Sequence, residues 1–394
     1  LTNKGGKILS VEVKDEKTYD GKPVILFDGQ QNKFGLNLNI GGRIVSTNDL
    51  YFTATKSGNG ISMRANYSGD KYIEYQYNLK PNSNNVDFNI NLNGLNQVIQ
   101  NNTISLNWEA TLLEQEKSGK KEQEHSAPYY KYVNENPDHL SIAEDEKEEL
   151  KEGKIEWFSF KQHFFSAVLI PAAPFEKGDL EVKVSTQPGQ VKWYGANMEM
   201  PFNQLASQNY AMRFYFGTNK FSTLKDQGHG IEKQVDMGYW PLKYINRFIV
   251  LPVFNFLEGF NWGYGLIILV LTILLKVAMS PLTYKSYISM AKMRILKPEM
   301  DVIKAKVGDD NPTLLQQEYL KLYKQVGVNP LGGCLPMLLQ LPFVMAFFFF
   351  FPNLFELRGE SFLWMKDLST YDDFIKFGVD IPILGNHLSL MCIL

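Results

Sequence analysis

Cysteine is nearly absent from this chain of 394 residues. The two cysteines, Cys334 and Cys392, both lie in apolar segments toward the carboxyl end. The polar first two thirds therefore have no disulfide framework, and cysteine usage leaves their compartment open.

The sequence also lacks the patterns that accompany catalysis or metal binding. No Walker A, nucleophile-elbow or dinucleotide-binding fingerprint is present, and Gly41-Gly42 is a hairpin signal rather than a phosphate cradle. The five histidines have no metal-ligand spacing; they are His125, His139, His163, His229 and His387. We therefore expect a protein that is not an enzyme and needs no cofactor or metal.

Neither sign of charge is in excess. The formal net charge is -2 and the pI is near 6.3, which argues against bulk binding of nucleic acid, although local basic patches could meet phosphates or lipid headgroups. The mean hydropathy of -0.21 describes neither half of the chain, because apolar residues crowd the last third. The composition thus indicates a multi-domain protein with parts in two environments.

Residues 1–218 alternate between apolar and polar side chains, as in Ile73–Leu79 and Val86–Leu92. This period of two, punctuated by Asn, Gly, Ser and Pro, predicts antiparallel strands in a large all-β sandwich. The charged stretches Glu114–Glu124 and Glu144–Lys154 have no strand rhythm and are interpreted as solvated loops or a short surface helix. Residues 219–239, which contain Gly228-His-Gly230, are interpreted as a linker.

Long apolar segments after residue 239 predict an α-helical transmembrane core. Lys243, Asn246 and Arg247 fall on one helical face of residues 240–258, which suits an amphipathic helix in the membrane interface that Pro252 should kink or end. The remaining predicted segments are transmembrane helices at 263–283 and 330–352, a periplasmic loop at 353–385, and the start of a further transmembrane helix at 386–394.

A basic segment, residues 284–326, separates the two long apolar runs. Lys285, Lys292, Arg294 and Lys297 lie close to the membrane ends, and the positive-inside rule places them in the cytoplasm. The β-sandwich then lies on the outer side of the membrane. The segment itself is predicted to form a helical hairpin, with helices from Tyr284 to about Val307, bent at Pro298, and from Thr313 to about Val326.

Lys276 is the one charge inside the first apolar run. A charge there costs several kcal/mol unless it meets water or a partner, so it is a candidate functional residue; the alternative is that it snorkels to a headgroup. Thr272 shares its helical face, and Gln340 lies inside the second run. These residues could line a hydrated groove. Equally, Thr272 could bond its own helix and Gln340 a neighbouring one.

Four motifs in this order and spacing carry a family resemblance: Lys276-Val-Ala-Met-Ser-Pro-Leu-Thr283, Ser289-Met-Ala-Lys-Met-Arg294, Gly308-Asp-Asp310 and Asn329-Pro-Leu-Gly-Gly-Cys334. The chain resembles the YidC family of membrane-protein insertases, the bacterial branch of the Oxa1 family. The resemblance covers about 240–368, including Leu363-Trp-Met-Lys-Asp-Leu368; the first 218 residues resemble the family only in architecture, as the large periplasmic domain of Gram-negative members.

The resemblance implies a multi-pass protein of the bacterial inner membrane that inserts and helps fold nascent membrane proteins. It would act alone or with the Sec translocon, receive clients from the ribosome or the signal-recognition-particle pathway, and contact membrane lipids. Lys276 would be the positive charge of a cytoplasm-open groove, where many members have arginine, with Thr272, Met279 and Gln340 beside it. The hairpin would recruit clients, and the family's remaining core helices would lie beyond Leu394.

Two other functions remain open from the residues alone. Trp108, Trp157 and Trp193 could stack sugars in a membrane-anchored periplasmic protein that binds or modifies carbohydrate, if they are exposed rather than in the core. A scaffold that only assembles the translocon is the second alternative, and it predicts that Lys276 is dispensable.

Overall fold

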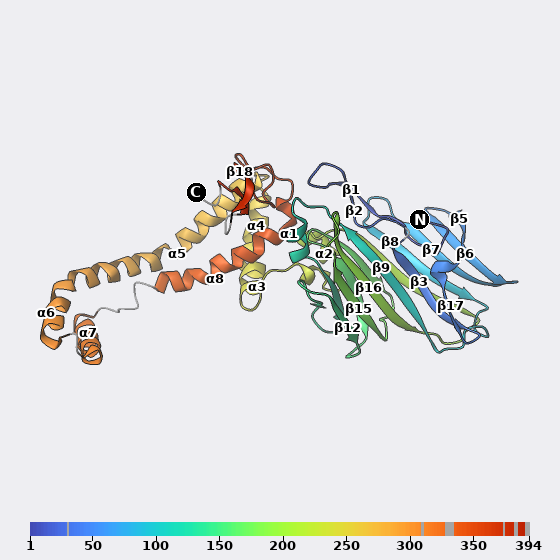
Figure 1. Ribbon diagram of the computed structural model, residues 1–394, viewed down its shortest axis with the longest axis horizontal. Helices are drawn as coiled ribbons and strands as arrows, with labels where there is room; N and C mark the ends of the chain where they lie inside the picture. Colours follow the sequence, from blue (N-terminus) through green and yellow to red (C-terminus); the bar gives the residue numbers. More distant parts are fainter. Residues whose placement is uncertain (30, 309–310, 328–334, 373–374, 382–384, 391–394) are drawn as a thin grey trace. The chain divides into compact units, whose positions relative to one another are not determined.

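The computed structural model describes residues 1–394 except 30, 309–310, 328–334, 373–374, 382–384 and 391–394. The chain forms two compact units, Leu1–Val235 and Asp236–Leu394. Strands make up most of the first unit and helices most of the second (Figure 1). Cys392, residues 309–310 of the motif at 308–310, and the whole motif at 329–334 with Cys334 lie outside the described residues.

The first unit contains a nine-stranded antiparallel sheet in the order β11-β10-β13-β14-β17-β8-β7-β6-β5. Its strands are β5 (Thr53–Ser57), β6 (Gly60–Ser68), β7 (Lys71–Leu79), β8 (Asn85–Asn93), β10 (Ala127–Tyr132), β11 (Asp138–His139), β13 (Ile155–Lys161), β14 (Phe165–Pro171) and β17 (Ser207–Thr218). A six-stranded antiparallel sheet follows the order β12-β15-β16-β9-β3-β4. It comprises β3 (Lys33–Ile40), β4 (Arg43–Ser46), β9 (Thr103–Leu113), β12 (Glu146–Leu150), β15 (Lys177–Val184) and β16 (Gln190–Pro201).

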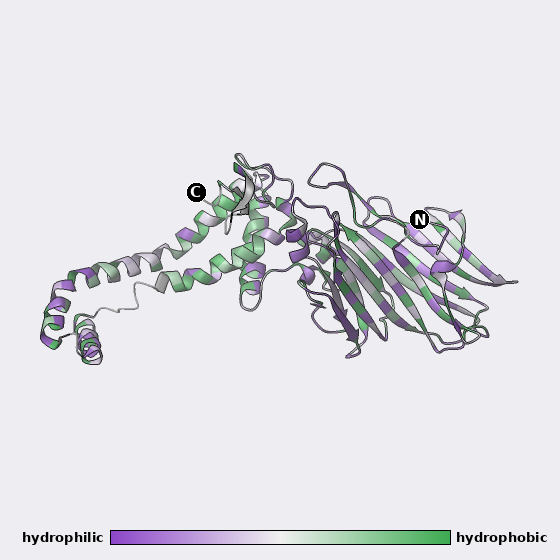
Figure 2. Ribbon diagram, viewed as in Figure 1, coloured by the Kyte–Doolittle hydropathy of each residue, from purple (hydrophilic) through white to green (hydrophobic). Residues whose placement is uncertain are grey.

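The alternating sequence explains how these sheets face each other. Along β9 every second side chain is buried, and Figure 2 shows the same alternation of apolar and polar residues on many strands. Trp108 of β9 meets Phe160 of β13 with ring centroids 4.5 Å apart and Phe214 of β17 at 5.4 Å, edge to face. Aromatic side chains from both sheets thus fill one core, which confirms the predicted β-sandwich.

Short elements complete the rim of the sandwich. β1 (Glu12–Lys17) pairs with β2 (Pro23–Ile25), and η1 spans Thr47–Asp49. Helix α1 (Gly119–Glu124) begins where Ser118 Oγ accepts a hydrogen bond from the Lys121 amide, a regular N-cap. A short helix therefore forms in the first charged stretch, as expected.

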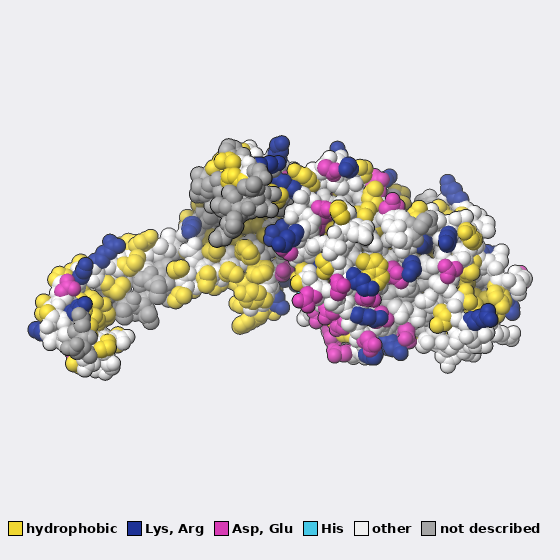
Figure 3. Space-filling model, in the orientation of Figure 1, with side chains coloured by type: hydrophobic (Ala, Val, Ile, Leu, Met, Phe, Trp, Pro, Cys, Tyr) yellow, Lys and Arg dark blue, Asp and Glu magenta, His cyan; other side chains and the backbone are white. Residues whose placement is uncertain are grey.

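The second charged stretch, Glu144–Lys154, was predicted as loop or short helix, and for its middle that prediction was wrong. It contains edge strand β12, which pairs with β15 through partners such as Glu148 and Leu180. Leu150 is buried, and Lys147 Nζ lies 3.1 Å from Asp179 Oδ1 on the neighbouring strand. Figure 3 shows acidic and basic side chains gathered over this region. Charged side chains protect an edge strand from pairing with other chains. Here they also obscure the alternation of apolar and polar residues by which a strand is recognised in the sequence.

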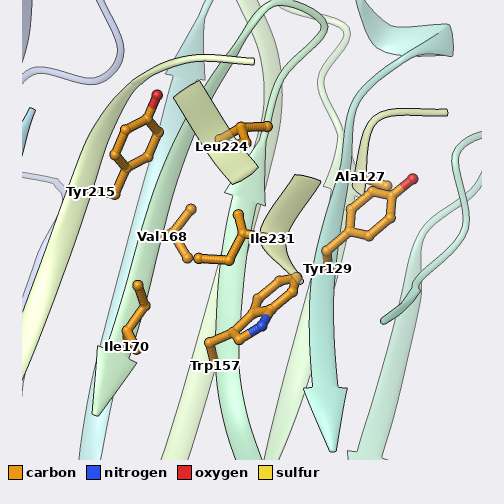
Figure 4. Close-up of a cluster of buried hydrophobic side chains, with 8 residues drawn as sticks. All are labelled: Ala127, Tyr129, Trp157, Val168, Ile170, Tyr215, Leu224 and Ile231. Atoms are coloured by element: carbon orange, nitrogen blue, oxygen red, sulfur yellow. The ribbon is translucent and has the colours of Figure 1, made fainter. Parts of the chain in front are cut away.

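The segment after β17, predicted as a linker, packs on the sheet instead. It forms α2 (Phe221–Asp226) and η2 (Ile231–Gln234), which bury Leu224 and Ile231 (Figure 4). Both side chains join Trp157, which points away from the sandwich core because its neighbour Phe158 points into it. The indole Nε1 also donates to the His229 carbonyl at 3.1 Å. Residues 219–235 therefore belong to the β-unit.

The helical unit begins with one continuous helical run. It consists of α3 (Leu242–Ile245), a π-turn η3 (Asn246–Val250) and α4 (Leu251–Glu258). In the π-turn the Leu251 amide bonds the Asn246 carbonyl, five residues back. This wide turn precedes Pro252, whose ring would clash with a normal turn, so Pro252 does not end the run as predicted. Asn246, which was assigned to the polar face, is instead buried, four residues after the buried Leu242.

Helix α5 (Tyr264–Ile295) is longer than the predicted span and includes the start of the predicted hairpin. Pro281 lies inside it and leaves the Val277 carbonyl without its backbone donor. The Ser280 hydroxyl donates to that carbonyl at 2.8 Å. The helix therefore continues to Ile295, and the prediction that a new helix begins at Tyr284 was wrong.

Two shorter helices follow. α6 (Lys297–Val307) has Pro298 in its first turn, near the expected bend, and ends at Gly308 with a positive φ. α7 (Pro312–Val326) begins where the Asn311 side chain accepts from the Leu314 amide at 3.2 Å. The Tyr323 hydroxyl lies 3.3 Å from Met300 Sδ, so α6 and α7 contact each other.

The last described helix is α8 (Leu335–Phe350), followed by η5 (Phe351–Asn353) and η6 (Phe355–Leu357). Strands β18 (Ile375–Ile381) and β19 (Gly385–Leu388) then pair antiparallel. The start of a transmembrane helix was expected at 386–394, but its described first residues belong to β19. Residues 391–394 lie outside the described part.

Candidate functional site

Helix α5 is the one helix in the described part that is long and apolar enough to cross a membrane. α8 is apolar but shorter, and the beginning of the predicted second span lies outside the described residues. At 1.5 Å per residue, Lys276 lies roughly 18 Å along α5 from Tyr264. A bilayer core is about 30 Å thick, so this position falls beyond its midplane.

Lys276 lies on the face of α5 that the protein leaves uncovered. Thr272 and Met279, four residues before and three after, share this face, whereas Ile267 and Leu271 are buried on the opposite side. Lys276 and Thr272 are exposed and Met279 is half-buried. The predicted grouping of these three residues on one face is therefore present, without protein packed against it in the described part of the chain.

Thr272 and Gln340 differ in how they satisfy their polar groups. The Thr272 hydroxyl donates to the Ile268 carbonyl of its own helix at 2.8 Å, which is the local alternative expected for it. Gln340 is half-buried on α8. Within the described ranges, neither Gln340 nor Lys276 makes a hydrogen bond or ion pair, so the structure does not join them.

The four basic residues assigned to the hairpin are all exposed. Lys285, Lys292 and Arg294 extend from the last turns of α5, and Lys297 is the first residue of α6. Lys292 and Arg294 near the carboxyl end of α5 also interact favourably with its helix dipole. These residues therefore belong to one continuous helix and its junction with the next.

Asn246 is a further polar residue at this site that the sequence pattern assigned to the wrong face. Its Nδ2 donates to the Met237 carbonyl at 2.9 Å and to the Ala346 carbonyl of α8 at 2.7 Å. It is fully buried, and its Oδ1 has no partner among the described residues. Asn246 thus fixes the helical run of residues 242–258 to α8. Its spacing of four residues from the apolar Leu242 and Val250, which are both buried, was the available signal.

The tryptophans considered for sugar binding do not form an exposed cluster. Trp108 is 3% exposed and Trp157 is fully buried, while half-buried Trp193 lies under the Lys183 ammonium at 4.6 Å. Their places are in or against the core, which contradicts the carbohydrate-binding alternative.

The β-unit contains two buried ionisable groups near α1. Burial raises the pKa of Glu122 to about 8, and its Oε2 accepts from the amides of Gln115 and Glu116. Burial lowers the pKa of Lys192 to about 8, and its Nζ donates to two carbonyls, of Ser126 at 2.6 Å and Ile142 at 2.7 Å. Both groups hold backbone in place. Across the described residues no group of three or more His, Cys, Asp or Glu side chains could hold a metal ion.

Models of two known protein families together match the whole chain. The family model described as "YidC periplasmic domain" matches residues 1–255, and that described as "60Kd inner membrane protein" matches residues 256–394. The chain belongs to the YidC family. Both matches lie end to end, so the resemblance predicted from the helical motifs is confirmed and extends to the β-sandwich. YidC family membership also makes this an inner-membrane protein with a periplasmic domain.

Relatives in the YidC family match along the whole chain. The proteins named "Membrane protein insertase YidC" from Parabacteroides distasonis and Phocaeicola vulgatus are 38% and 40% identical, each over 100% of this chain and 65% of the relative. The protein of that name from Amoebophilus asiaticus is 36% identical over 100% of this chain and 68% of its own length. This chain thus spans about 65% of the length of the first two. Their shared name denotes insertion rather than a catalysed reaction.

Among solved structures, the chain is similar to two proteins related to galactose mutarotase, at low TM-scores. A galactose mutarotase related enzyme from Lactobacillus acidophilus gives a TM-score of 0.35 at 9% identity, covering 55% of this chain and 93% of that one. A galactose mutarotase-like protein from Lactobacillus casei gives 0.34 at 9% identity, covering 52% and 99%.

Proposed function

We propose that this protein inserts and helps fold membrane proteins, as the name of its relatives states for them. The observation that carries the proposal is Lys276: a charge at bilayer depth, on an uncovered helix face, with no ion pair or hydrogen bond to any described residue. A lysine within a membrane helix is costly unless water or a partner meets it.

The charge would act on the polar tail of a client protein. Moving such a tail through hydrocarbon is the costly step of insertion, because its backbone and charges lose water. A hydrated groove along the face of Lys276, Thr272 and Met279 shortens that path. Lys276 attracts acidic residues of the tail, with an energy closer to the few kcal/mol of a wet site than to that of a dry one. Apolar client segments then move into lipid because their own burial is favourable.

α8 supplies the second wall of this groove in the proposal. It is the described part of the predicted span 330–352, and Gln340 offers an amide to client backbone groups at bilayer depth. The segments 240–258, 263–283 and 330–352 then act as interfacial helix and two crossings of a multi-pass protein. Residues 353–385 lie on the periplasmic side and 284–326 in the cytoplasm.

The basic junction of α5 and α6 receives the client first. Lys285, Lys292, Arg294 and Lys297 are exposed and face water on the cytoplasmic side, where a ribosome or a nascent chain from the signal-recognition-particle pathway arrives. Anionic lipid headgroups compete for the same charges. In this proposal the protein acts alone or with the Sec translocon.

Reconstitution of the full-length protein with a single-span client that has an acidic tail tests the role of Lys276. We compare Lys276→Ala, Lys276→Arg and the exchange Lys276→Val with Val277→Lys. The exchange keeps composition and depth but moves the charge by about 100° around the helix. We expect translocation in the arginine variant and its loss in the other two.

Equal translocation in all variants would contradict the proposal, because the charge would then only snorkel. That result would support a scaffold that assembles other components. A client with a neutral tail is the control, since its translocation should depend much less on Lys276.

A further inference from the structure

A tight turn lies in the segment after α8. The Phe362 amide donates to the Met365 carbonyl at 3.0 Å, and the Met365 amide donates to the Phe362 carbonyl at 2.9 Å. Leu363, the first of the two central residues, has φ of +53°. Glycine, asparagine and aspartate dominate such positions, because a β-carbon is crowded there. The chain thus has a bulky apolar side chain where the backbone favours glycine.

The two residues at the tip of this turn are exposed, Leu363 much more than Trp364. Leu363 is 71% exposed and Trp364 is 37% exposed. The Trp364 Nε1 donates to Asp372 Oδ2 at 3.2 Å, so the polar group of the indole is already bonded and its ring is free to meet an apolar phase. A strained backbone that presents a leucine beside a tryptophan is a poor arrangement for a turn in water.

Contacts at the start of α5 fix the depth of the turn relative to the membrane. Gly265, the second residue of α5, lies so close to the Phe362 ring that a β-carbon on residue 265 would collide with it. One residue earlier, the Tyr264 hydroxyl donates to Glu258 Oε1 at 2.8 Å. The carboxylate belongs to water, whereas the helix that follows is apolar. The turn therefore lies where α5 enters the bilayer from the periplasmic side.

Other exposed aromatic residues lie at the same end of α5. Phe260 and Trp262, just before the helix, stack with ring centroids 5.2 Å apart and are both exposed. Aromatic rings of this kind concentrate at the boundary between headgroups and acyl chains. The apolar tip continues this boundary, which identifies lipid as the phase that it meets.

We propose that Leu363 and Trp364 form a wedge that inserts into the periplasmic leaflet at the boundary between headgroups and acyl chains. The partner is the phospholipid surface itself. The wedge holds the loop at a fixed depth in the membrane. Because Phe362 of the loop contacts Gly265, the outer end of α5 is held at the same depth. This inference depends on α5 crossing the membrane and is independent of whether the protein inserts clients.

A fluorescent probe at the tip tests the wedge. Full-length protein with Cys334→Ser and Cys392→Ser receives Leu363→Cys, is labelled with nitrobenzoxadiazole, and is reconstituted into vesicles of phosphatidylethanolamine and phosphatidylglycerol. Some of these lipids have a nitroxide near the top of the acyl chain. The matched control is Ile44→Cys, an apolar residue of the β-unit that is 80% exposed. We expect several-fold stronger quenching by the nitroxide lipid at residue 363 than at residue 44, and a blue-shifted emission.

Two results would overturn the proposal. Quenching by aqueous iodide at residue 363 equal to that at residue 44 would place the tip in water. Protection from both quenchers would mean that protein covers it. If Leu363→Cys disturbs folding, unlabelled protein is compared with Trp364→Phe: nitroxide lipids should quench a smaller share of the tryptophan emission in the variant. An unchanged share would also contradict the wedge.

Discussion

The two units of this protein each place a lysine among apolar residues, and they treat it in opposite ways. Lys192 in the β-unit is fully buried, and its ammonium donates to two backbone carbonyls. Lys276 in the helical unit is exposed to whatever surrounds the helix and bonds no described residue. The ammonium of Lys192, a structural lysine, thus has its hydrogen-bond acceptors within the folded β-unit. Lys276 has no such partner among the described residues.

The apolar surfaces of the two units show the same contrast. The β-unit buries its large aromatic residues in contact with one another, as Trp108 and Phe160 do. The helical unit leaves large apolar side chains uncovered on its helices (Figure 3); they include Phe248, Phe256, Ile273, Val277, Leu338 and Phe348. Water drives the packing of the first unit, whereas lipid completes the packing of the second.

The largest expected effect is on the aromatic core of the β-unit. Trp108→Ala removes a ring that contacts both sheets, and should destabilise this unit by about 3–5 kcal/mol, the usual cost of such a cavity. Urea unfolding of the purified protein in detergent, followed by circular dichroism in the β region, measures it. The control is Trp262→Ala, an exposed residue of the helical unit, with an expected change within about 0.5 kcal/mol. Similar losses in both variants would break the contrast between the units.

Lys192→Met tests whether burial of this lysine is purely structural. Because its folded pKa of about 8 lies below the ordinary value of 10.5, the folded state binds fewer protons than the unfolded state between these pH values. Wild-type stability should therefore rise from pH 8 to 10.5, by at most about 3 kcal/mol from this group, and the methionine variant should lack that rise. Unfolding midpoints at pH 8 and pH 10 measure the difference. Exposed Lys183→Met is the control, and an equal slope in all three proteins would contradict the assignment.

Asn246→Ala tests the buried polar contact of the helical unit. The change leaves the Met237 and Ala346 carbonyls without their side-chain donor and should cost about 1–3 kcal/mol. Thermal unfolding in detergent and the rate of proteolysis near α8 measure the loss. Asn255→Ala, at an exposed position of α4, should change neither. If both asparagine variants behave alike, Asn246 does not hold α8.

The smallest expected effect is at Ser280. Ser280→Ala removes the hydroxyl that bonds the Val277 carbonyl beside Pro281, and side-chain hydrogen bonds between membrane helices average only about 0.6 kcal/mol, so we expect a loss of that order. Hydrogen exchange of the amides around Pro281 should become faster, because the helix bends more easily there. Ser280→Thr keeps a hydroxyl able to make the same bond and should exchange like the wild type. Faster exchange in the threonine variant as well would mean that the bond is not what keeps α5 continuous.

Residue patterns predicted the sandwich because its strands bury one face each, so that alternation follows the pleat. The same reasoning failed where a strand is at an edge or has both faces covered. Charged residues at Glu144–Lys154 hide β12, and two apolar residues, Leu224 and Ile231, gave too little signal to show that 219–235 covers the sheet. Both cases depend on contacts with residues far away in the sequence.

In the candidate site, Lys276 could be found because it is the one charge in an apolar run. The face that it shares with Thr272 and Met279 follows from helical spacing alone. The length of α5 could not be predicted, because Pro281 normally signals a break and only the bond from Ser280 cancels that signal. Asn246 was assigned to the wrong face because its polarity was given more weight than its spacing of four residues from Leu242, which is buried.

The unbroken course of α5 has a mechanical consequence. Its 32 residues give a rod about 48 Å long, well beyond the roughly 30 Å of a bilayer core. With its outer end held at Gly265 by Phe362, the rod acts as a lever. A tilt of about 10° would displace the α5–α6 junction by roughly 8 Å for a rod of this length. A force exerted on the basic junction would thus also move Lys276, which lies on the same continuous helix.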